Sequence, residues 1–205
     1  MNHHLPEHDD SDSHNKISTV RLEAFSDGVM AIIITITVLG IKVPEGAGFL
    51  ALRPLLPLLV TYAISFQTVG TYWNNHHHLL QATSHVSAGM MWANLNLLFW
   101  LSLIPFTTGW LGANHGGSAP TALYAAVLFL CGASYSLLQW SVVKHSDKRE
   151  QLAEELIKSK KGMISLVSYL LAVALAFYSP IISDVLIILV AVIWFIPDKR
   201  IEKFI

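Results

Sequence analysis

Four polar side chains open the first apolar stretch of the sequence and are its best candidates for chemistry: Arg21, Glu23, Ser26 and Asp27. If a helix begins near Ser18, Asp27 lies about 14 Å along it, at about 1.5 Å per residue. An ionisable group at that depth in an apolar segment is costly and usually faces protein or water. Position alone leaves two interpretations open, a functional carboxylate or an interfacial charge paired with Arg21 or Lys16.

A second polar cluster ends the next apolar stretch, where three histidines are adjacent: His76, His77 and His78. Successive residues on a helix point about 100° apart, so the three rings cannot bind one metal ion together. We therefore predict no resident metal, and we expect one or two of the rings to bond buried partners. Asn94 and Asn96, in the following stretch, are candidates for hydrogen bonds between helices, each worth about 1 kcal/mol.

An apolar stripe follows the first polar cluster. Ile32, Ile36 and Leu39 are spaced i, i+4 and i+7, so they share one face of a helix, and Thr35 lies beside that face. Such a stripe generally contacts lipid or another helix, and a pore lining is the rarer arrangement. The residues by themselves do not decide between these interpretations.

Other kinds of chemistry find no support in the sequence. It has no phosphate-binding glycine loop, no HExxH motif and no Ser/His/Asp set at a recognisable spacing, so we predict that the chain is not an enzyme and carries no cofactor. Cys131 is the only cysteine, which excludes a disulfide framework. The net charge of -1 argues against a nucleic-acid partner.

The composition indicates the environment that must position these residues. The chain has 205 residues, of which 53% are hydrophobic and 13% charged, against about 25% charged in a typical globular domain. Residues 54–143 contain no Lys, Arg, Asp or Glu. Because one membrane-crossing helix takes about 20 residues, that run alone holds about three crossings. The chain is therefore predicted to be an all-α integral membrane protein.

Apolar segments and breaks at proline and glycine divide the chain further. They predict six transmembrane helices, at about residues 18–41, 50–80, 86–111, 121–143, 163–178 and 182–196. The first has Ser18 or Thr19 as its N-cap, and the third is expected to kink near Pro105. Residues 1–16 are predicted to be a disordered polar tail, and 17–205 to form the membrane domain.

The basic residues give the orientation. With six crossings, eleven of the thirteen Lys and Arg residues lie on the side that holds both termini, and only Lys42 and Arg53 lie opposite. Positive residues accumulate on the cytoplasmic side. Both termini are therefore predicted to be cytoplasmic, in a multi-pass protein of the cell (inner) membrane that contacts lipid.

Three motifs occur in order within the first three predicted helices. These are Arg21, three intervening residues and Phe25-Ser26-Asp27; then Tyr72-Trp73-x-Asn75-His76-His77; then Ser102-Leu103-Ile104-Pro105-Phe106-Thr107. Together they resemble the signature of the transmembrane protein 175 potassium-channel family. The last three predicted helices match that family only in hydropathy.

The resemblance implies a cation channel that favours potassium, with a central pore lined by the first helices of a homotetramer, since this chain has one six-helix repeat. It implies that Ile32, Ile36 and Leu39 form the constriction and that Thr35 contributes to selectivity. It also places Arg21, Phe25, Ser26 and Asp27 in a network with Trp73 and His77 that holds the first helix. The sequence agrees in lacking a TVGYG-like filter.

Two alternatives to a channel stay open from the residues. One is a secondary transporter, coupled to protons or another cation through Asp27 and His77. The other is a membrane scaffold that conducts nothing, in which Arg21, Asp27 and His77 only fix the packing of the helices.

Overall fold

The protein folds as a helical bundle without strands over the residues that its computed structural model describes, 18–83, 85–146 and 160–195. The predicted tail at 1–16 and most of the charged segment after Lys144 lie outside these residues. In chain order the helices are α1 (Thr19–Leu39), α2 (Leu56–Gln81), α3 (Ala88–Ser102), α4 (Ile104–Ala113), α5 (Ser118–His145), α7 (Lys160–Ala176) and α8 (Pro180–Phe195), with a 3-10 helix, η2 (Phe49–Leu55), before α2.

These helices confirm the six predicted segments, with α3 and α4 forming the third of them end to end. Among the described residues, four segments are long and apolar enough to cross a membrane, Thr19–Leu39, Phe49–Gln81, Ala88–Ala113 and Ser118–His145. α7 and α8 are shorter, at 17 and 16 residues. Ser18 caps α1 as predicted, accepting a hydrogen bond from the Arg21 backbone N–H at 3.4 Å.

Two predicted helices differ in detail, and proline explains both differences. The α-helix predicted from about residue 50 begins only at Leu56, because Pro54 and Pro57 have no N–H to give to the carbonyls four residues earlier, and the chain forms η2 instead. The predicted kink near Pro105 is a complete break at Leu103, where the Leu103 N–H bonds the Trp100 carbonyl at 3.2 Å and α4 starts anew.

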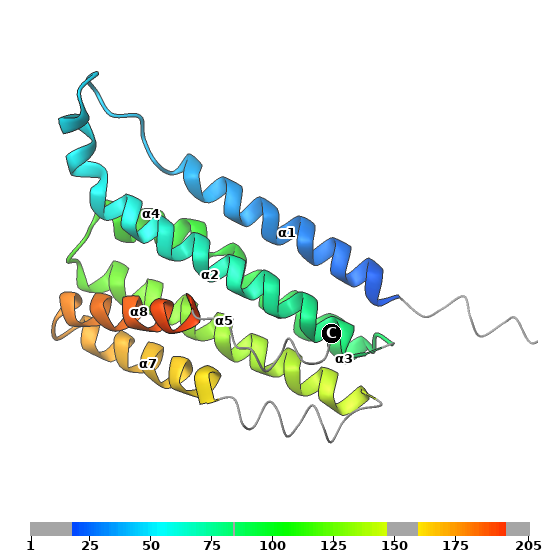
Figure 1. The fold of residues 1–205 in the computed structure, drawn as a ribbon. Coiled ribbons are helices and arrows are strands. Elements are labelled where there is room, and N and C mark those ends of the chain that lie inside the picture. The colour runs from blue at the N-terminus through cyan, green and yellow to red at the C-terminus, as the bar shows by residue number, and fades with distance from the viewer. Residues whose placement is uncertain (1–17, 84, 147–159, 196–205) are drawn as a thin grey trace, which may run out of the picture.

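Figure 1 shows how the helices are arranged. α1 lies along one side of the bundle and α7 along the other, with α2, α8 and α5 between them in this view. α1 packs on α2, α3 and α4, while α5, α7 and α8 pack on one another. The connections α1–α2, α4–α5 and α7–α8 gather at one end, opposite the end where α1 starts (Figure 1).

α2 and α4, two of the helices that α1 packs against, approach each other closely. At Gly112 in α4, an added Cβ would lie 2.8 Å from the Leu58 Cα of α2. Only glycine fits that spacing without moving a backbone. α2 and α4 therefore meet closely and, together with α3, form the surface on which α1 rests.

Candidate functional site

The helix α1 has two sharply different faces. Leu22, Ser26, Met30, Ile33 and Thr37 recur every three or four residues and are buried against the bundle. On the opposite face, the stripe of Ile32, Ile36 and Leu39 is 60%, 42% and 79% exposed. The predicted stripe is therefore uncovered within one subunit along about 10 Å of helix, at about 1.5 Å per residue.

Exposure alone does not distinguish this stripe from a lipid-facing surface, because α7 and α8 also expose many apolar side chains. What distinguishes it is Thr35, which is exposed beside the stripe. Its hydroxyl donates to the carbonyls of Ala31 and Ile32, at 3.1 and 2.9 Å. Since the single hydroxyl hydrogen is bound within the helix, the lone pairs of the oxygen are left to point outward, where they can accept or coordinate.

A buried chain of polar side chains fixes the other face of α1. Asn94 of α3 donates through Nδ2 to Ser26 Oγ at 2.9 Å, and its Oδ1 lies 2.7 Å from His76 Nε2 of α2. Ser26 in turn donates to the Leu22 carbonyl at 2.8 Å. Ser26, His76 and Asn94 are all fully buried. Because Asn94 Oδ1 can only accept, His76 Nε2 carries its proton, and the chain ties α1, α2 and α3 together.

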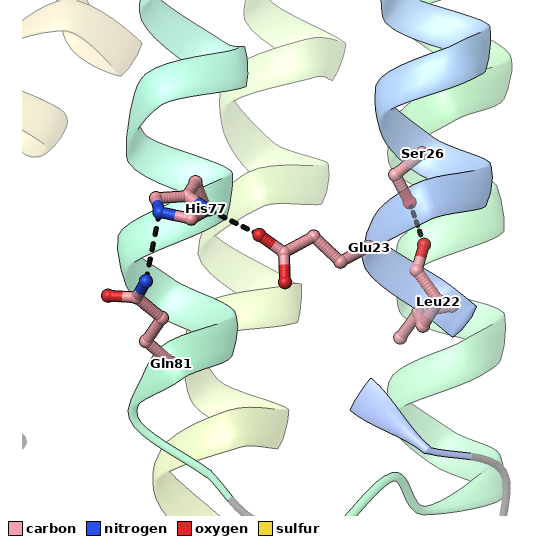
Figure 2. A network of polar contacts seen from close by, with 5 residues as sticks. All are labelled: Leu22, Glu23, Ser26, His77 and Gln81. Carbon is pink, nitrogen blue, oxygen red and sulfur yellow. Dashed lines mark hydrogen bonds and ion pairs between the residues drawn. The ribbon is translucent and has the colours of Figure 1, made fainter. Parts of the chain in front are cut away.

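A second contact joins α1 to α2 nearer the start of α1, as Figure 2 shows. The Glu23 carboxylate of α1 pairs with Nδ1 of His77, and His77 Nε2 lies 2.9 Å from Gln81 Nε2. A carboxylate only accepts, so Nδ1–H of His77 donates to Glu23, and Nε2 is left to accept from the Gln81 amide. The pair is partly exposed, in contrast to the buried chain through Asn94.

Of the six residues predicted to hold α1, the structure brings two into contacts between helices. Ser26 bonds Asn94 and His77 bonds Glu23, but the two do not bond each other. Within the subunit the side chains of Arg21, Phe25 and Trp73 are exposed, and Asp27 Oδ1 is buried without a hydrogen-bond partner among the described residues. A network of all six stays a prediction.

The residues that complete these contacts were partly visible in the sequence. Asn94 stood out as a polar residue in an apolar segment, and the expectation that one or two histidines bond buried partners is met by His76 with Asn94. Glu23 lay among the polar residues of the first helix, but nothing in the sequence assigned it to His77. The described residues contain no group of three His, Cys, Asp or Glu side chains placed to hold a metal ion.

Comparison with known proteins agrees with this geometry. The sequence model of the family described as the endosomal/lysosomal potassium channel TMEM175 matches residues 21–105, the part of the chain that contains the stripe and both polar contacts. A potassium channel of Chryseobacterium sp. (strain P1-3) is 48% identical over 183 residues, which are 89% of this chain and 95% of that relative. A potassium channel of Streptomyces collinus is 31% identical over 170 residues, 78% of this chain and 82% of the relative.

A solved structure has the same fold. The crystal structure of a lysosomal potassium-selective channel TMEM175 homolog from Chamaesiphon minutus superposes with a TM-score of 0.74 at 28% identity. The match covers 86% of this chain and 95% of that one. The six-segment arrangement, including the half formed by α5, α7 and α8, is therefore shared over nearly the whole described chain.

Proposed function

The chain belongs to the TMEM175 family of potassium channels, and on that premise we propose that it conducts potassium passively through a pore lined by α1. The observation that carries the proposal is the exposed stripe of Ile32, Ile36 and Leu39, which lies on the face of α1 opposite the buried polar chain. An ion channel is not a class of enzyme, and the family relationship agrees with the absence of catalytic motifs.

The pore requires several subunits. One bundle buries its own helices and leaves the α1 stripe uncovered, so a water-filled path arises only where α1 helices of different subunits face one another. A closed ring with rotational symmetry repeats the same contact around one axis. We propose a homotetramer, with lipid against the outward apolar surfaces of α7 and α8.

The constriction is then apolar. Rings of Ile32, Ile36 and Leu39, one from each subunit, narrow the pore along about 10 Å. A hydrophobic constriction closes by excluding water, with no need for a moving plug. Because these side chains are long and branched, a small rotation of α1 changes the open radius.

Selectivity in such a pore comes from hydroxyls. The carbonyls of α1 are bound within the helix, so they are not free to replace the water around an ion. Thr35, whose hydrogen is given to Ala31 and Ile32, presents lone pairs toward the proposed axis. A ring of such oxygens eases partial dehydration of a cation. We expect weaker discrimination of potassium from sodium than a carbonyl filter gives.

The contacts that hold α1 in place set the rotation of the stripe. Ser26 and His77 act through Asn94 and Glu23 within the subunit. Arg21, Phe25 and Trp73 are exposed in the single subunit, so we place them at contacts between subunits. Asp27, also on α1, lies close enough to α2 for its charge to act on His76.

The orientation of the bundle follows from its basic residues. The end where α1 starts is proposed to face the cytoplasm, together with both termini, because eleven of thirteen Lys and Arg residues are predicted on that side. The other end then faces outward from the inner membrane. The coupled-transporter alternative finds no support among the two bacterial relatives described above, which are named potassium channels.

Ion flux through liposomes tests the proposal. The purified protein is reconstituted under defined potassium and sodium gradients, and Ile32→Asn is compared with the wild type. We expect the polar side chain to wet the constriction, raising sodium flux about tenfold or more, a change of about 1.4 kcal/mol in the barrier.

Val38→Asn is the matched control, because Val38 is also exposed on α1 but lies on another face. It should leave flux and selectivity near the wild-type values. Equal effects of the two substitutions, or none from Ile32→Asn, would contradict a pore lined by the stripe. Single-channel current steps from the wild type would separate a channel from a transporter, whose flux saturates at far lower rates.

A further inference from the structure

A lysine and a tryptophan form an exposed pair near the end of α5. Lys144 Nζ lies 5.4 Å from the centroid of the Trp140 ring, one turn earlier in the same helix. An ammonium group within about 6 Å of an indole face is attracted by the electrons of the ring. No carboxylate of the described segments forms an ion pair with Lys144. The indole therefore fixes the position of this positive charge without neutralising it.

The exposed side of α5 below this pair is apolar. Leu123 and Leu137 are exposed, and they precede Lys144 by 21 and 7 residues. Because seven residues make nearly two full turns, the three side chains share one side of the helix. The surface of α5 is thus apolar along most of its length and ends in a positive charge. That pattern matches a phospholipid with a negative headgroup, whose long apolar chains lie below the charge.

α3 runs beside this side of α5 in the opposite direction. Asn96 Nδ2 of α3 donates to Ser134 Oγ of α5 at 2.7 Å. A Cβ added to Gly89 of α3 would lie 3.7 Å from Ser141 Oγ of α5. The two contacts are seven residues apart on each helix, and the residue numbers rise on one helix as they fall on the other. These contacts fix the register of the antiparallel pair.

The register brings a second tryptophan to the level of Trp140. Trp92 of α3 is three residues from Gly89, and Trp140 is one residue from Ser141, both toward the middle of the bundle. At about 1.5 Å per residue, their positions along the bundle differ by about 3 Å. Trp92 is 74% exposed and Trp140 is 62% exposed. Two neighbouring helices therefore each present an indole at nearly one depth.

Both indoles face outward on the same side of the contact between α3 and α5. One flank of that contact is lined by fully buried side chains, Met90 and Leu97 on α3 and Leu138 and Val142 on α5. Because these buried flanks face the interior of one bundle, the opposite flanks face outward together. The two tryptophans and Lys144 lie on the outward flanks, and with Leu137 we call them the Trp–Lys patch.

We propose that the Trp–Lys patch binds one anionic phospholipid in each subunit, with the lipid phosphate at Lys144 and the acyl chains along Leu137 and the two indoles. Tryptophan is enriched at the level of lipid headgroups, and basic residues near the surface attract anionic lipids. α5 ends at the end of the bundle where α1 starts (Figure 1), the side where eleven of the thirteen Lys and Arg residues are predicted. A free anion would use Lys144 but would have no use for the apolar side chains.

Quenching of tryptophan fluorescence by brominated lipids tests the patch in the full-length protein. The protein is reconstituted in phosphatidylcholine bilayers, and phosphatidylglycerol or phosphatidylcholine with brominated acyl chains is titrated in. The protein has six tryptophans, so the shares of Trp140 and Trp92 are obtained by difference from Trp140→Phe and Trp92→Phe. For both shares we expect phosphatidylglycerol to bind about fivefold more tightly than phosphatidylcholine, the equivalent of about 1 kcal/mol for one lysine near anionic lipid.

Lys144→Gln should reduce this preference to about one for both tryptophans, although Trp92 lies on the other helix. Quenching by phosphatidylcholine should persist in the variant, which shows that the folded surface is still in contact with lipid. Lys144→Arg keeps the charge and should keep the preference. In 1 M sodium chloride, where the screening length is about 3 Å, the preference of the wild type should fall as well.

Two matched variants control for charge and for position. Lys160→Gln removes an exposed lysine at the start of α7, on the same predicted side of the membrane, and should leave the preference at about fivefold. Trp110→Phe removes an exposed tryptophan near the end of α4, which lies at the opposite end of the bundle. The share of Trp110 should show no preference for phosphatidylglycerol.

Other results would overturn the site. Equal quenching by the two brominated lipids in the wild type would mean that the patch contacts lipid without selecting it. No quenching of the Trp92 and Trp140 shares would mean that a second subunit covers the patch. If Lys160→Gln lowered the preference as far as Lys144→Gln, the net charge of the surface would be the cause. None of these measurements uses ion flux, so the channel proposal can fail while this site stands.

Discussion

Two halves of the bundle are held together in different ways. In the first, α1 is joined to α2 and α3 by a fully buried chain of side chains, Ser26, Asn94 and His76, and by the pair of Glu23 with His77. In the second, α5, α7 and α8 pack mainly through apolar and small side chains, with single bonds such as Ser183 Oγ to the Ala172 carbonyl at 2.8 Å.

The difference follows from what each half must specify. Apolar packing is not directional, so it tolerates small rotations of a helix, whereas a hydrogen bond fails when its angle changes. The helix whose rotation sets a proposed pore is the one held by directional bonds. The half formed by α5, α7 and α8 is held mainly by the fit of apolar side chains, with few hydrogen bonds between its helices, and there hydropathy is the main sequence constraint.

Asn94→Leu should have the largest effect of the substitutions that test this contrast. It leaves Ser26 without its donor and the Nε2–H of His76 without an acceptor, in a region with no exposure. We expect a loss of about 1–3 kcal/mol in the free energy of unfolding and a lower ratio of potassium to sodium flux, because α1 is free to rotate. Thermal unfolding and liposome flux measure the two. Unchanged selectivity would mean that this chain stabilises the fold without orienting the stripe.

Glu23→Gln should have a smaller effect on stability. The pair with His77 is partly exposed (Figure 2), and such pairs contribute about 0.2–1 kcal/mol. The amide of Gln can still accept from Nδ1–H, so α1 remains attached but more loosely. His77→Gln in the same background should add little further loss if the two residues act together. Additive losses in this double-mutant cycle would show that they act separately.

The contrast between the halves also explains which features the sequence predicted. Six apolar segments follow from hydropathy alone, and the shared face of Ile32, Ile36 and Leu39 follows from helical spacing, whereas the exposure of that face is known only from the structure. The start of α2 was placed six residues too early, counting from residue 50 to Leu56, because hydropathy does not distinguish a 3-10 turn from an α-helix. Pro54 and Pro57 carried that information.

Partners between helices were harder to predict than faces. Ser26 bonds Asn94, and His77 bonds Glu23, because of how α1, α2 and α3 are rotated against one another, and no local pattern encodes that rotation. Thr121 illustrates the limit. In sequence it resembles any threonine near a helix start, and its action on the Asp184 carboxylate is identified only once α8 packs against α5.

Thr35→Val tests the proposed contribution of hydroxyls to selectivity without disturbing packing. Valine has nearly the same shape, and Thr35 is exposed within the subunit, so the unfolding midpoint should stay within experimental error. We expect potassium flux to continue and its ratio over sodium to fall about fivefold, the equivalent of about 1 kcal/mol. Thr61→Val, which removes a similar hydroxyl from α2, is the matched control. An unchanged ratio in Thr35→Val would remove the hydroxyl ring from the selectivity argument.

Trp194→Phe should have the smallest effect, because it removes a single hydrogen bond from the half that is held mainly by apolar packing. Trp194 Nε1 donates to Ser165 Oγ at 2.8 Å, linking α8 to α7. Its loss should cost about 0.6 kcal/mol, the average for hydrogen bonds between membrane helices. The phenyl ring retains most of the apolar contact, and neither helix touches the stripe, so flux and selectivity should not change. If selectivity fell as far as in Asn94→Leu, the second half would also set the rotation of α1, and the division of the bundle into an oriented half and a packed half would fail.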